Sequence, residues 1–344
     1  MKFGISLMGV YDTPNYLSDT LRFVKFIEEK GFDQVWVGDS QLIHRDAYTD
    51  LARWSLNTSK IKLGPLVTNP VTRHPSVTAS AICSIDEISN GRALLAIGTG
   101  ETAVRRVGIK TRPVAELESA VKVIRELCRG NTVDFGTTRM GIRWNKGRQI
   151  PIYITGSGPK VLQLAGEIGD GAIINTGASK ETVTFSIDSV RAGMEKSGRS
   201  PNAVDLALFL FAAVADERRV ALDEAKPFAT WFFVNLPNLP VVAKQEISSE
   251  ARKAFEEYRN QYYKYDEEVS HHAPKWDSAS TKASFLDDDT VSKFTLAGTP
   301  EDAVRQLQDL EKLGVESYIF RVGYSDNFER QLELIADHVL PEFS

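Results

Sequence analysis

The sequence predicts a single (β/α)₈ barrel, in which eight parallel strands form a closed sheet and a helix follows each strand. Short apolar runs of strand length alternate with longer segments whose apolar residues recur at helical spacing. The strand-like runs end in glycine or polar residues, which is where parallel α/β proteins bind ligands. The alternation continues without an internal change of composition, which favours one barrel over the alternative of two Rossmann-like halves.

Four strand–helix units are expected in the first part of the chain. The helices are expected to begin at Ser, Asp or Pro residues, with Ser18 as the first cap, and glycines such as Gly31 and Gly130 end them. The predicted strands are Phe3–Met8, Gln34–Val37, Lys62–Thr68 and Arg92–Gly98, and the predicted helices are Ser18–Gly31, Asp46–Ser59, Ser76–Ile88 and Pro113–Arg129.

The second part of the chain supplies four more units and two insertions. Asn131–Gln149 is polar and glycine-containing and is predicted to form a surface hairpin after strand four. Residues 216–295, after strand seven, are helical, charged and aromatic, and we expect a lid or a dimer contact within the single domain 1–344. The predicted strands are Pro151–Thr155, Gly171–Asn175, Val204–Ala215 and Ser317–Val322, and the predicted helices are Lys160–Ile168, Lys180–Gly198, Thr299–Leu313 and Asn327–Val339.

Composition excludes several classes of protein. The chain has a net charge of −5 without long runs of one sign, which gives no electrostatic footprint for nucleic acid or an anionic membrane. No window approaches 18 uninterrupted apolar residues, and we expect a cytoplasmic protein. Cys83 and Cys128 fall at apolar helix positions and are expected to be buried thiols, and no His, Cys or Asp spacing matches a metal site.

The motif GSGPK at 156–160 follows a predicted strand and opens a helix. The backbone N–H groups of Gly156, Ser157 and Gly158 can therefore converge on a phosphate at the positive end of that helix. The alternative is a tight turn and an ordinary helix start. The motif lacks the third glycine of the dinucleotide fingerprint and the acidic residue that should follow, so we reject that interpretation.

A second glycine turn, GTGE at 98–101, ends in a carboxylate. Glu101 could donate or accept a proton, and the alternative is that it caps a helix or lies in a surface turn. The loop after strand three, VTNPVTRHP, adds polar residues at a neighbouring strand end. The residues expected to share one site at these strand ends are Thr68, Asn69, Arg73, His74, Thr99 and Glu101.

Four stretches together carry a resemblance to a known family. VGDS at 37–40, LGPLVTNPVTRHP at 63–75, AIGTGE at 96–101 and PIYITGSGPKVLQLAGEIGDGAI at 151–173 resemble the bacterial luciferase-like superfamily. Within it they are most similar to the branch that contains methylene-tetrahydromethanopterin reductase and deazaflavin-dependent glucose-6-phosphate dehydrogenase. The resemblance covers Met1–Ala178 and resumes at the helix that begins TPED.

The resemblance implies a barrel that binds coenzyme F420, or alternatively FMN, with the ring at the strand ends. It implies a non-prolyl cis peptide bond between Leu66 and Val67, behind the ring. Asp39 and Glu101 are expected to act in catalysis. The residues expected to bind the cofactor are Ser40, Leu66, Val67, Thr68, Asn69, Gly98, Thr99, Gly100, Thr155, Gly156, Ser157 and Gly158.

Two positions depart from that branch. Ser6 stands where the tetrahydromethanopterin reductases carry a carboxylate, and Ser40 stands where His is common. Because of these two changes, the pterin and sugar-phosphate substrates of that branch are not carried over. The first hypothesis is an F420-dependent oxidoreductase that acts on a small organic molecule, and we expect it to form a homodimer. The alternatives are an FMN-dependent monooxygenase and a non-catalytic flavin-binding protein.

Overall fold

Eight parallel strands form a nearly closed barrel in the computed structural model. The structure describes residues 1–10, 13–236, 249–250, 252–253, 256–257, 286–323, 325 and 327–343. The strands follow the order β3-β2-β1-β11-β9-β8-β7-β4, and every neighbouring pair in this order is parallel, as the sequence predicts. They are β1 (Lys2–Ser6), β2 (Gln34–Val37), β3 (Lys62–Pro65), β4 (Leu95–Ile97), β7 (Ile152–Gly156), β8 (Gly171–Ile174), β9 (Asp205–Val214) and β11 (Ser317–Val322).

The barrel closes between β3 and β4 through isolated bridges rather than a continuous ladder. The Leu94 amide donates to the Leu63 carbonyl at 2.9 Å, and the Thr68 amide donates to the Ala96 carbonyl at 3.0 Å. The third strand ends at Pro65 and not at Thr68 as expected, because the chain crosses over there: the Leu66 amide still bonds β2, at Val37, whereas Thr68 bonds β4. We call the backbone hydrogen bonds that join residues 63–68 to residues 92–98 the β3–β4 seam.

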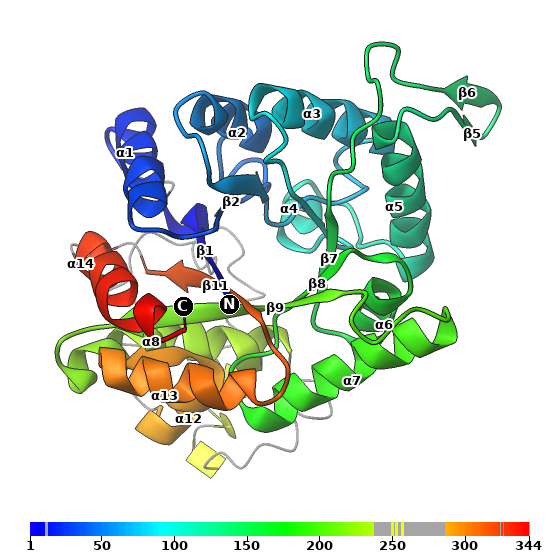
Figure 1. Cartoon of the computed structure of the whole chain (residues 1–344). Coiled ribbons are helices and arrows are strands. Elements are labelled where there is room, and N and C mark those ends of the chain that lie inside the picture. The colour runs from blue at the N-terminus through cyan, green and yellow to red at the C-terminus, as the bar shows by residue number, and fades with distance from the viewer. Residues whose placement is uncertain are drawn as a thin grey trace.

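Helices surround the strands (Figure 1). Their apolar faces pack on the outside of the sheet in one large cluster that includes Val24, Ile82 and Phe320. A second cluster, with Trp36, Phe209 and Ile319, fills the barrel and its mouth, as the alternation of side chains along a strand requires. The surrounding helices are α1 (Tyr16–Glu29), α2 (Ala47–Ser55), α3 (Pro75–Ile88), α5 (Val114–Cys128), α6 (Pro159–Ile168), α7 (Lys180–Lys196), α13 (Pro300–Glu311) and α14 (Phe328–Leu334).

The insertion after β4 is a hairpin, as predicted. Strands β5 (Val133–Phe135) and β6 (Thr138–Met140) pair antiparallel and project beyond α5 in Figure 1. In the insertion after β9, the structure describes α8 (Arg218–Asn235) and α12 (Asp288–Phe294). Most of the segment between them lies outside the described residues. The lid or dimer contact was expected over 216–295, so α8 and α12 belong to it and the rest of it falls largely outside the described residues.

Further local details differ from the prediction. Ser18 does not cap α1: Asn15 is the N-cap residue, and the Ser18 hydroxyl donates to its carbonyl at 2.9 Å. Two short elements were not expected. They are α4 (Thr102–Arg106) and β10 (Leu296–Gly298), and β10 pairs with the carboxyl-terminal end of β9.

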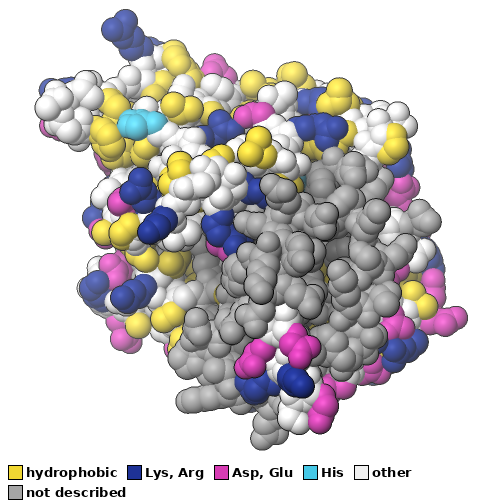
Figure 2. Space-filling model, turned by 180° about the vertical axis from the view of Figure 1, so that it is seen from behind, with side chains coloured by type: hydrophobic (Ala, Val, Ile, Leu, Met, Phe, Trp, Pro, Cys, Tyr) yellow, Lys and Arg dark blue, Asp and Glu magenta, His cyan; other side chains and the backbone are white. Residues whose placement is uncertain are grey.

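The ends of the chain meet on one side of the barrel. The Met1 amino group donates to the Phe343 carbonyl at 3.5 Å, and N and C lie close together in Figure 1. Cys83 and Cys128 are buried free thiols, as expected. In the described part of the chain, no helix is long and apolar enough to cross a membrane. Figure 2 shows charged side chains of both signs on the face turned away in Figure 1.

Candidate active site

A cavity of about 390 Å³ lies at the carboxyl ends of the strands. Its walls combine apolar side chains with a few polar groups, which is typical of small-molecule sites. The peptide bond between Leu66 and Val67, at the edge of this cavity, is cis, as the resemblance implied. The cavity is lined by Met8, Ser40, Leu66, Val67, Asn69, Gly98, Thr99, Gly100, Glu101, Thr102, Ala103, Thr155, Gly156, Ser157, Asn175, Phe209, Phe211, Trp231, Leu236 and Arg321.

The structure brings most of the expected site residues together around this cavity. Five of them are not in its lining. Thr68 is fully buried in the β3–β4 seam, Gly158 begins α6, and the Asp39 carboxylate is bound by an arginine; the other two, Arg73 and His74, lie elsewhere. The expected residues that line the cavity are Ser40, Leu66, Val67, Asn69, Gly98, Thr99, Gly100, Glu101, Thr155, Gly156 and Ser157.

Glu101 lies at the entrance of the cavity. It occupies the N-cap position of α4, but its side chain makes no capping hydrogen bond. Its carboxylate is 45% exposed and forms an ion pair with Arg105 at 3.1 Å. Glu101 is therefore an accessible carboxylate beside a small-molecule cavity, and a capping role does not account for its position.

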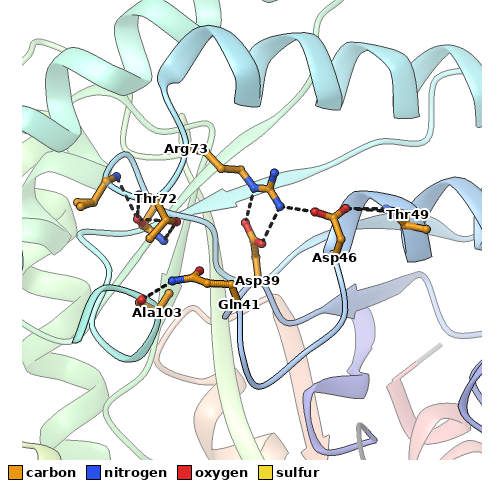
Figure 3. A network of polar contacts seen from close by, with 9 residues as sticks. Asp39, Gln41, Asp46, Thr49, Thr72, Arg73 and Ala103 are labelled. Atoms are coloured by element: carbon orange, nitrogen blue, oxygen red, sulfur yellow. Dashed lines mark hydrogen bonds and ion pairs between the residues drawn. The ribbon is translucent and has the colours of Figure 1, made fainter. Parts of the chain in front are cut away.

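Asp39 is held in a clamp around Arg73 (Figure 3). The Arg73 Nε and Nη2 atoms each lie 3.3 Å from an Asp39 carboxylate oxygen, and Nη2 also donates to Asp46 at 2.6 Å. Burial by itself lowers the pKa of Arg73, but the two carboxylates more than offset this and hold it above its ordinary value. Asp46 in turn accepts the Thr49 amide at 3.0 Å and caps α2, so the clamp joins the loop after β2 to the loop after β3.

Two further contacts extend this connection to the cavity wall. The Asn69 Oδ1 atom accepts the amides of Val71 at 3.0 Å and Thr72 at 2.9 Å, which fixes the first turn after β3. The Gln41 amide donates to the Ala103 carbonyl in α4 (Figure 3). The loops after β2, β3 and β4 are thus tied to one another by side chains.

Arg73 and His74 were expected in the same site as Glu101, and the structure corrects this. Arg73 lines a separate hollow on the other side of its loop, together with Gln41, Thr72 and Val107. His74 is the N-cap residue of α3, and its Nδ1 atom accepts the Ser76 amide at 3.3 Å. The sequence could not separate the two sides of a loop that contains two prolines.

The glycine turn after β7 leaves the N-terminus of α6 open. Gly158 is the N-cap residue and no side chain caps the helix. A Cβ atom added at Gly158 would meet no heavy atom within 4 Å, whereas one at Gly156 would lie 2.6 Å from the Val161 side chain. The Ser157 hydroxyl donates to the Asn175 carbonyl at 2.6 Å and fixes the turn. A helix start of this kind can bind an anion through its backbone N–H groups.

Two buried polar atoms in the cavity wall suit a polar ligand. Thr155 Oγ1 and Asn175 Oδ1 are buried, and neither has a hydrogen-bond partner among the residues that the structure describes. Buried polar side-chain atoms are nearly always hydrogen-bonded in native proteins. A polar ligand in the cavity would supply partners for both.

Several lining residues were missed by the sequence analysis. Asn175 had a usable signal, because it ends the sixth strand, and Arg321 had one as the single charge in the apolar strand SYIFRV. Phe209 and Phe211 gave no signal that distinguishes them from core aromatics, whereas Trp231 belongs to the segment that was expected to cover the strand ends.

The family model described as luciferase-like monooxygenase matches residues 1–317. The chain belongs to this family. It is 32% identical to the 5,10-methylenetetrahydromethanopterin reductase of Archaeoglobus fulgidus, over 99% of each chain. It is 30% identical to the F420-dependent glucose-6-phosphate dehydrogenase of Kineococcus radiotolerans, over 67% of this chain and 73% of the relative.

The fold of this family member also matches solved structures. The F420-dependent tetrahydromethanopterin reductase of Methanopyrus kandleri superimposes with a TM-score of 0.84 and 25% identity, covering 100% of this chain and 99% of that chain. The eight strands and their surrounding helices are therefore the barrel of the luciferase-like proteins, and the sequence prediction of that family and fold is confirmed.

Proposed function

We propose that this protein is a coenzyme F420-dependent oxidoreductase that transfers hydride to or from a small organic substrate. Two relatives at 30% identity or more are named as a methylenetetrahydromethanopterin reductase and an F420-dependent glucose-6-phosphate dehydrogenase. Both names denote redox enzymes, and the M. kandleri structure is named for dependence on the same coenzyme.

The observation that carries the proposal is the fit of the cavity to such a coenzyme. An apolar wall with Leu66, Val67 and Phe209 suits a flat ring, and the unpartnered Thr155 and Asn175 oxygens can accept hydrogen bonds from polar groups on a ligand. At the same edge, the uncapped start of α6 suits the coenzyme phosphate.

Each group of residues then has a role. Gly156, Ser157 and Gly158 bind the phosphate, and the chain from Leu66 to Asn69 together with Ser40 lies along the ring. Coenzyme F420, when bound, supplies or accepts hydride at C5 of its deazaflavin ring. Glu101 exchanges a proton with the substrate at the cavity entrance, because its carboxylate is accessible there.

Asp39 was expected to act in catalysis, and we propose a narrower role for it. Its carboxylate is 7% exposed and both of its oxygens lie 3.3 Å from Arg73 nitrogens. A carboxylate bound in this way by a guanidinium holds the loop after β2 in place. Asp39 therefore positions Ser40 and does not exchange protons with a substrate.

An FMN-dependent monooxygenase is the second candidate, because the matching family is described as luciferase-like monooxygenase. A non-catalytic flavin-binding protein is disfavoured, because the accessible Glu101 carboxylate has no capping role. A homodimer, a cytoplasmic location and a single domain over 1–344 stay predictions.

Titration of the purified protein with F420 and with FMN tests the proposal. We expect the protein to bind F420 and to have little affinity for FMN. F420 binding is followed at its absorbance band at about 420 nm. Tight binding of FMN alone, followed near about 450 nm, would overturn it in favour of the monooxygenase. Absence of binding by both would overturn the proposal and both flavin-binding alternatives, and would leave a scaffold protein that kept the barrel.

A further inference from the structure

A buried arginine faces the cavity from the last strand of the barrel. Side chains alternate along β11, and Ile319 belongs to the cluster that fills the barrel. Arg321, two residues further on, therefore points to the same side, at the level of the cavity. It is 3% exposed and contributes to the cavity lining.

Aromatic rings hold this guanidinium in place. It lies over the Phe211 ring at 5.2 Å and over the Phe228 ring at 5.8 Å, and Phe211 is also its partner in the pairing of β9 with β11. Phe211 and Phe228 are themselves in contact, with ring centroids 4.6 Å apart. A guanidinium fixed between rings keeps its fork of N–H donors oriented at little cost in side-chain entropy.

His44 lies near Arg321, but it adds no charge to this part of the cavity lining. Burial, and then the nearby positive charge of Arg321, lower the pKa of His44 to about 3. At neutral pH His44 is therefore uncharged. The Glu101 carboxylate, which also lines the cavity, forms an ion pair with Arg105 at the entrance.

The arginine lies away from the part of the cavity that suits a coenzyme phosphate. Strands β8 and β9 separate β11 from β7, whose glycine turn opens α6. The wall around Arg321 also carries Phe209, Phe211 and Trp231, so it offers one cation surrounded by aromatic surface. We name these four residues the arginine wall.

We propose that the arginine wall is the substrate side of the cavity and that Arg321 selects substrates that carry a carboxylate on a flat or apolar body. This inference rests on the proposed function, because only an enzyme has a substrate. A planar guanidinium binds a carboxylate through two parallel hydrogen bonds, and such bonds are stronger in a buried site than in water. The aromatic surface beside it favours an apolar body over a heavily hydroxylated one.

Benzoate and benzamide are suitable probes, because they have nearly the same shape and differ in charge. Calorimetric titration of the full-length protein, without coenzyme and again in the presence of F420, should give benzoate the higher affinity. The difference should be about 10- to 100-fold, the range of charge-assisted hydrogen bonds. Equal affinities for the two probes, or no binding of benzoate, would overturn the inference.

Substitution of the arginine assigns the preference to one side chain. Arg321→Gln should remove the preference for benzoate, and Arg321→Lys, which keeps the charge and loses the fork, should retain part of it. Arg330→Gln is the matched control, because Arg330 is an exposed arginine on α14 paired with Asp216. Its preference should equal that of the wild type, and thermal unfolding of each variant checks the fold.

Two outcomes separate this inference from the proposed function. If F420 does not bind the wild type, the proposed function fails, but the two probes still decide the inference on the protein without coenzyme. If Arg321→Gln loses F420 affinity and keeps its preference for benzoate, the arginine serves the coenzyme and the inference is wrong. If Arg321→Gln does not fold, the Arg321→Lys variant decides: an unchanged preference there contradicts the role of the fork.

Discussion

Glu101 and Asp39 both follow strands of the barrel, but their carboxylates have different surroundings. Arg73 binds both oxygens of Asp39 inside the protein, whereas the Glu101 carboxylate is 45% exposed at the cavity entrance. A proton donor must reach its substrate, and a positioning carboxylate must keep its partner. The proposal that Glu101, and not Asp39, exchanges a proton with the substrate rests on this difference in surroundings.

Replacement of Glu101 by Gln tests its assignment. The amide keeps the shape and removes the ionisable proton, so we expect turnover to fall by about 10²- to 10⁴-fold while F420 affinity changes little. Glu118→Gln is the matched control, because Glu118 also pairs with a cation four residues along a helix, at the protein surface. Steady-state kinetics and F420 titration on both variants are needed. Turnover within a few-fold of the wild type would remove Glu101 from the mechanism.

His44 should make the protein less stable as the pH falls below neutral. Its pKa is lowered from 6.5 to about 3, first by burial and then by Arg321, so the unfolded chain takes up the proton first. The free energy of unfolding should therefore decrease from pH 6.5 downward, by up to about 1.4 kcal/mol for each pH unit, until about pH 3.

Urea unfolding of the wild type, His44→Gln and His338→Gln between pH 7 and pH 5 measures this effect. His338 is an exposed histidine at the C-terminal end of the chain and serves as the control. The pH dependence should become flatter in His44→Gln alone. The same slope in all three proteins would show that His44 is not the group responsible.

The sequence identified site residues where a motif marked a strand end. It failed where a residue belongs to the site only because of the direction in which its side chain points. The glycines of GTGE and GSGPK were found because turns need them. Phe211 and Arg321 lie inside strands, and whether such a residue faces the barrel interior or the helices depends on register. His74 shows the reverse error, since a histidine after a strand proved to be a helix cap.

At the level of elements, the loops after β2, β3 and β4 are joined to one another by polar side chains. The clamp around Arg73 joins Asp39 to Asp46, and Gln41 joins the loop after β2 to α4 (Figure 3). Since Ser40, Asn69 and Glu101 lie on these loops, their relative positions depend on the clamp.

Arg73→Lys tests this dependence. A lysine keeps the charge but cannot bind Asp39 with two nitrogens while it also reaches Asp46, so we expect a stability loss of about 1–3 kcal/mol and weaker F420 binding. Arg112→Lys, at the exposed start of α5, is the control. Thermal unfolding and F420 titration give the two quantities. If Arg73→Lys loses stability but binds F420 as the wild type does, the clamp supports the fold and does not shape the site.

The long elements were predicted because they have enough residues to show a period. The strand SYIFRV and the capped helix from Thr299 are six and twelve residues long, and both were found. α4 and β10 have five and three residues, which is too short for a helical or strand period to be visible. The first cap was misplaced by three residues, because Ser18 and Asn15 are both favourable caps and packing decides between them.

For the whole molecule, the β3–β4 seam is where barrel closure and the candidate site coincide. Its contacts include the bonds from the Leu94, Thr68 and Gly98 amides, at 2.9 to 3.0 Å. Residues 66–69 and 98–101 continue directly from these bonds into the cavity wall. A change in the seam should therefore alter both the stability of the barrel and the shape of the site.

Gly64→Ala is the substitution that changes the seam most directly. A Cβ atom at residue 64 would lie 2.2 Å from the Leu94 carbonyl oxygen and 3.1 Å from the Trp36 ring, so β3 would have to move away from β4. We expect a stability loss of about 2 kcal/mol or more, as for other overpacked interiors. Gly158→Ala is the control for stability, because nothing lies within 4 Å of its added atom, and its loss should be below about 1 kcal/mol.

Urea unfolding gives the stability of both glycine variants, and F420 titration tests the coupling to the site. When the seam opens, Val67 and Asn69 move relative to Gly98, so Gly64→Ala should weaken F420 binding while the protein is still fully folded. Wild-type stability in Gly64→Ala would mean that the barrel closes without the close approach of Gly64 to Leu94. A destabilised variant with wild-type F420 affinity would mean that the cavity wall keeps its shape independently of the seam, because contacts such as the Arg73 clamp then suffice to hold it.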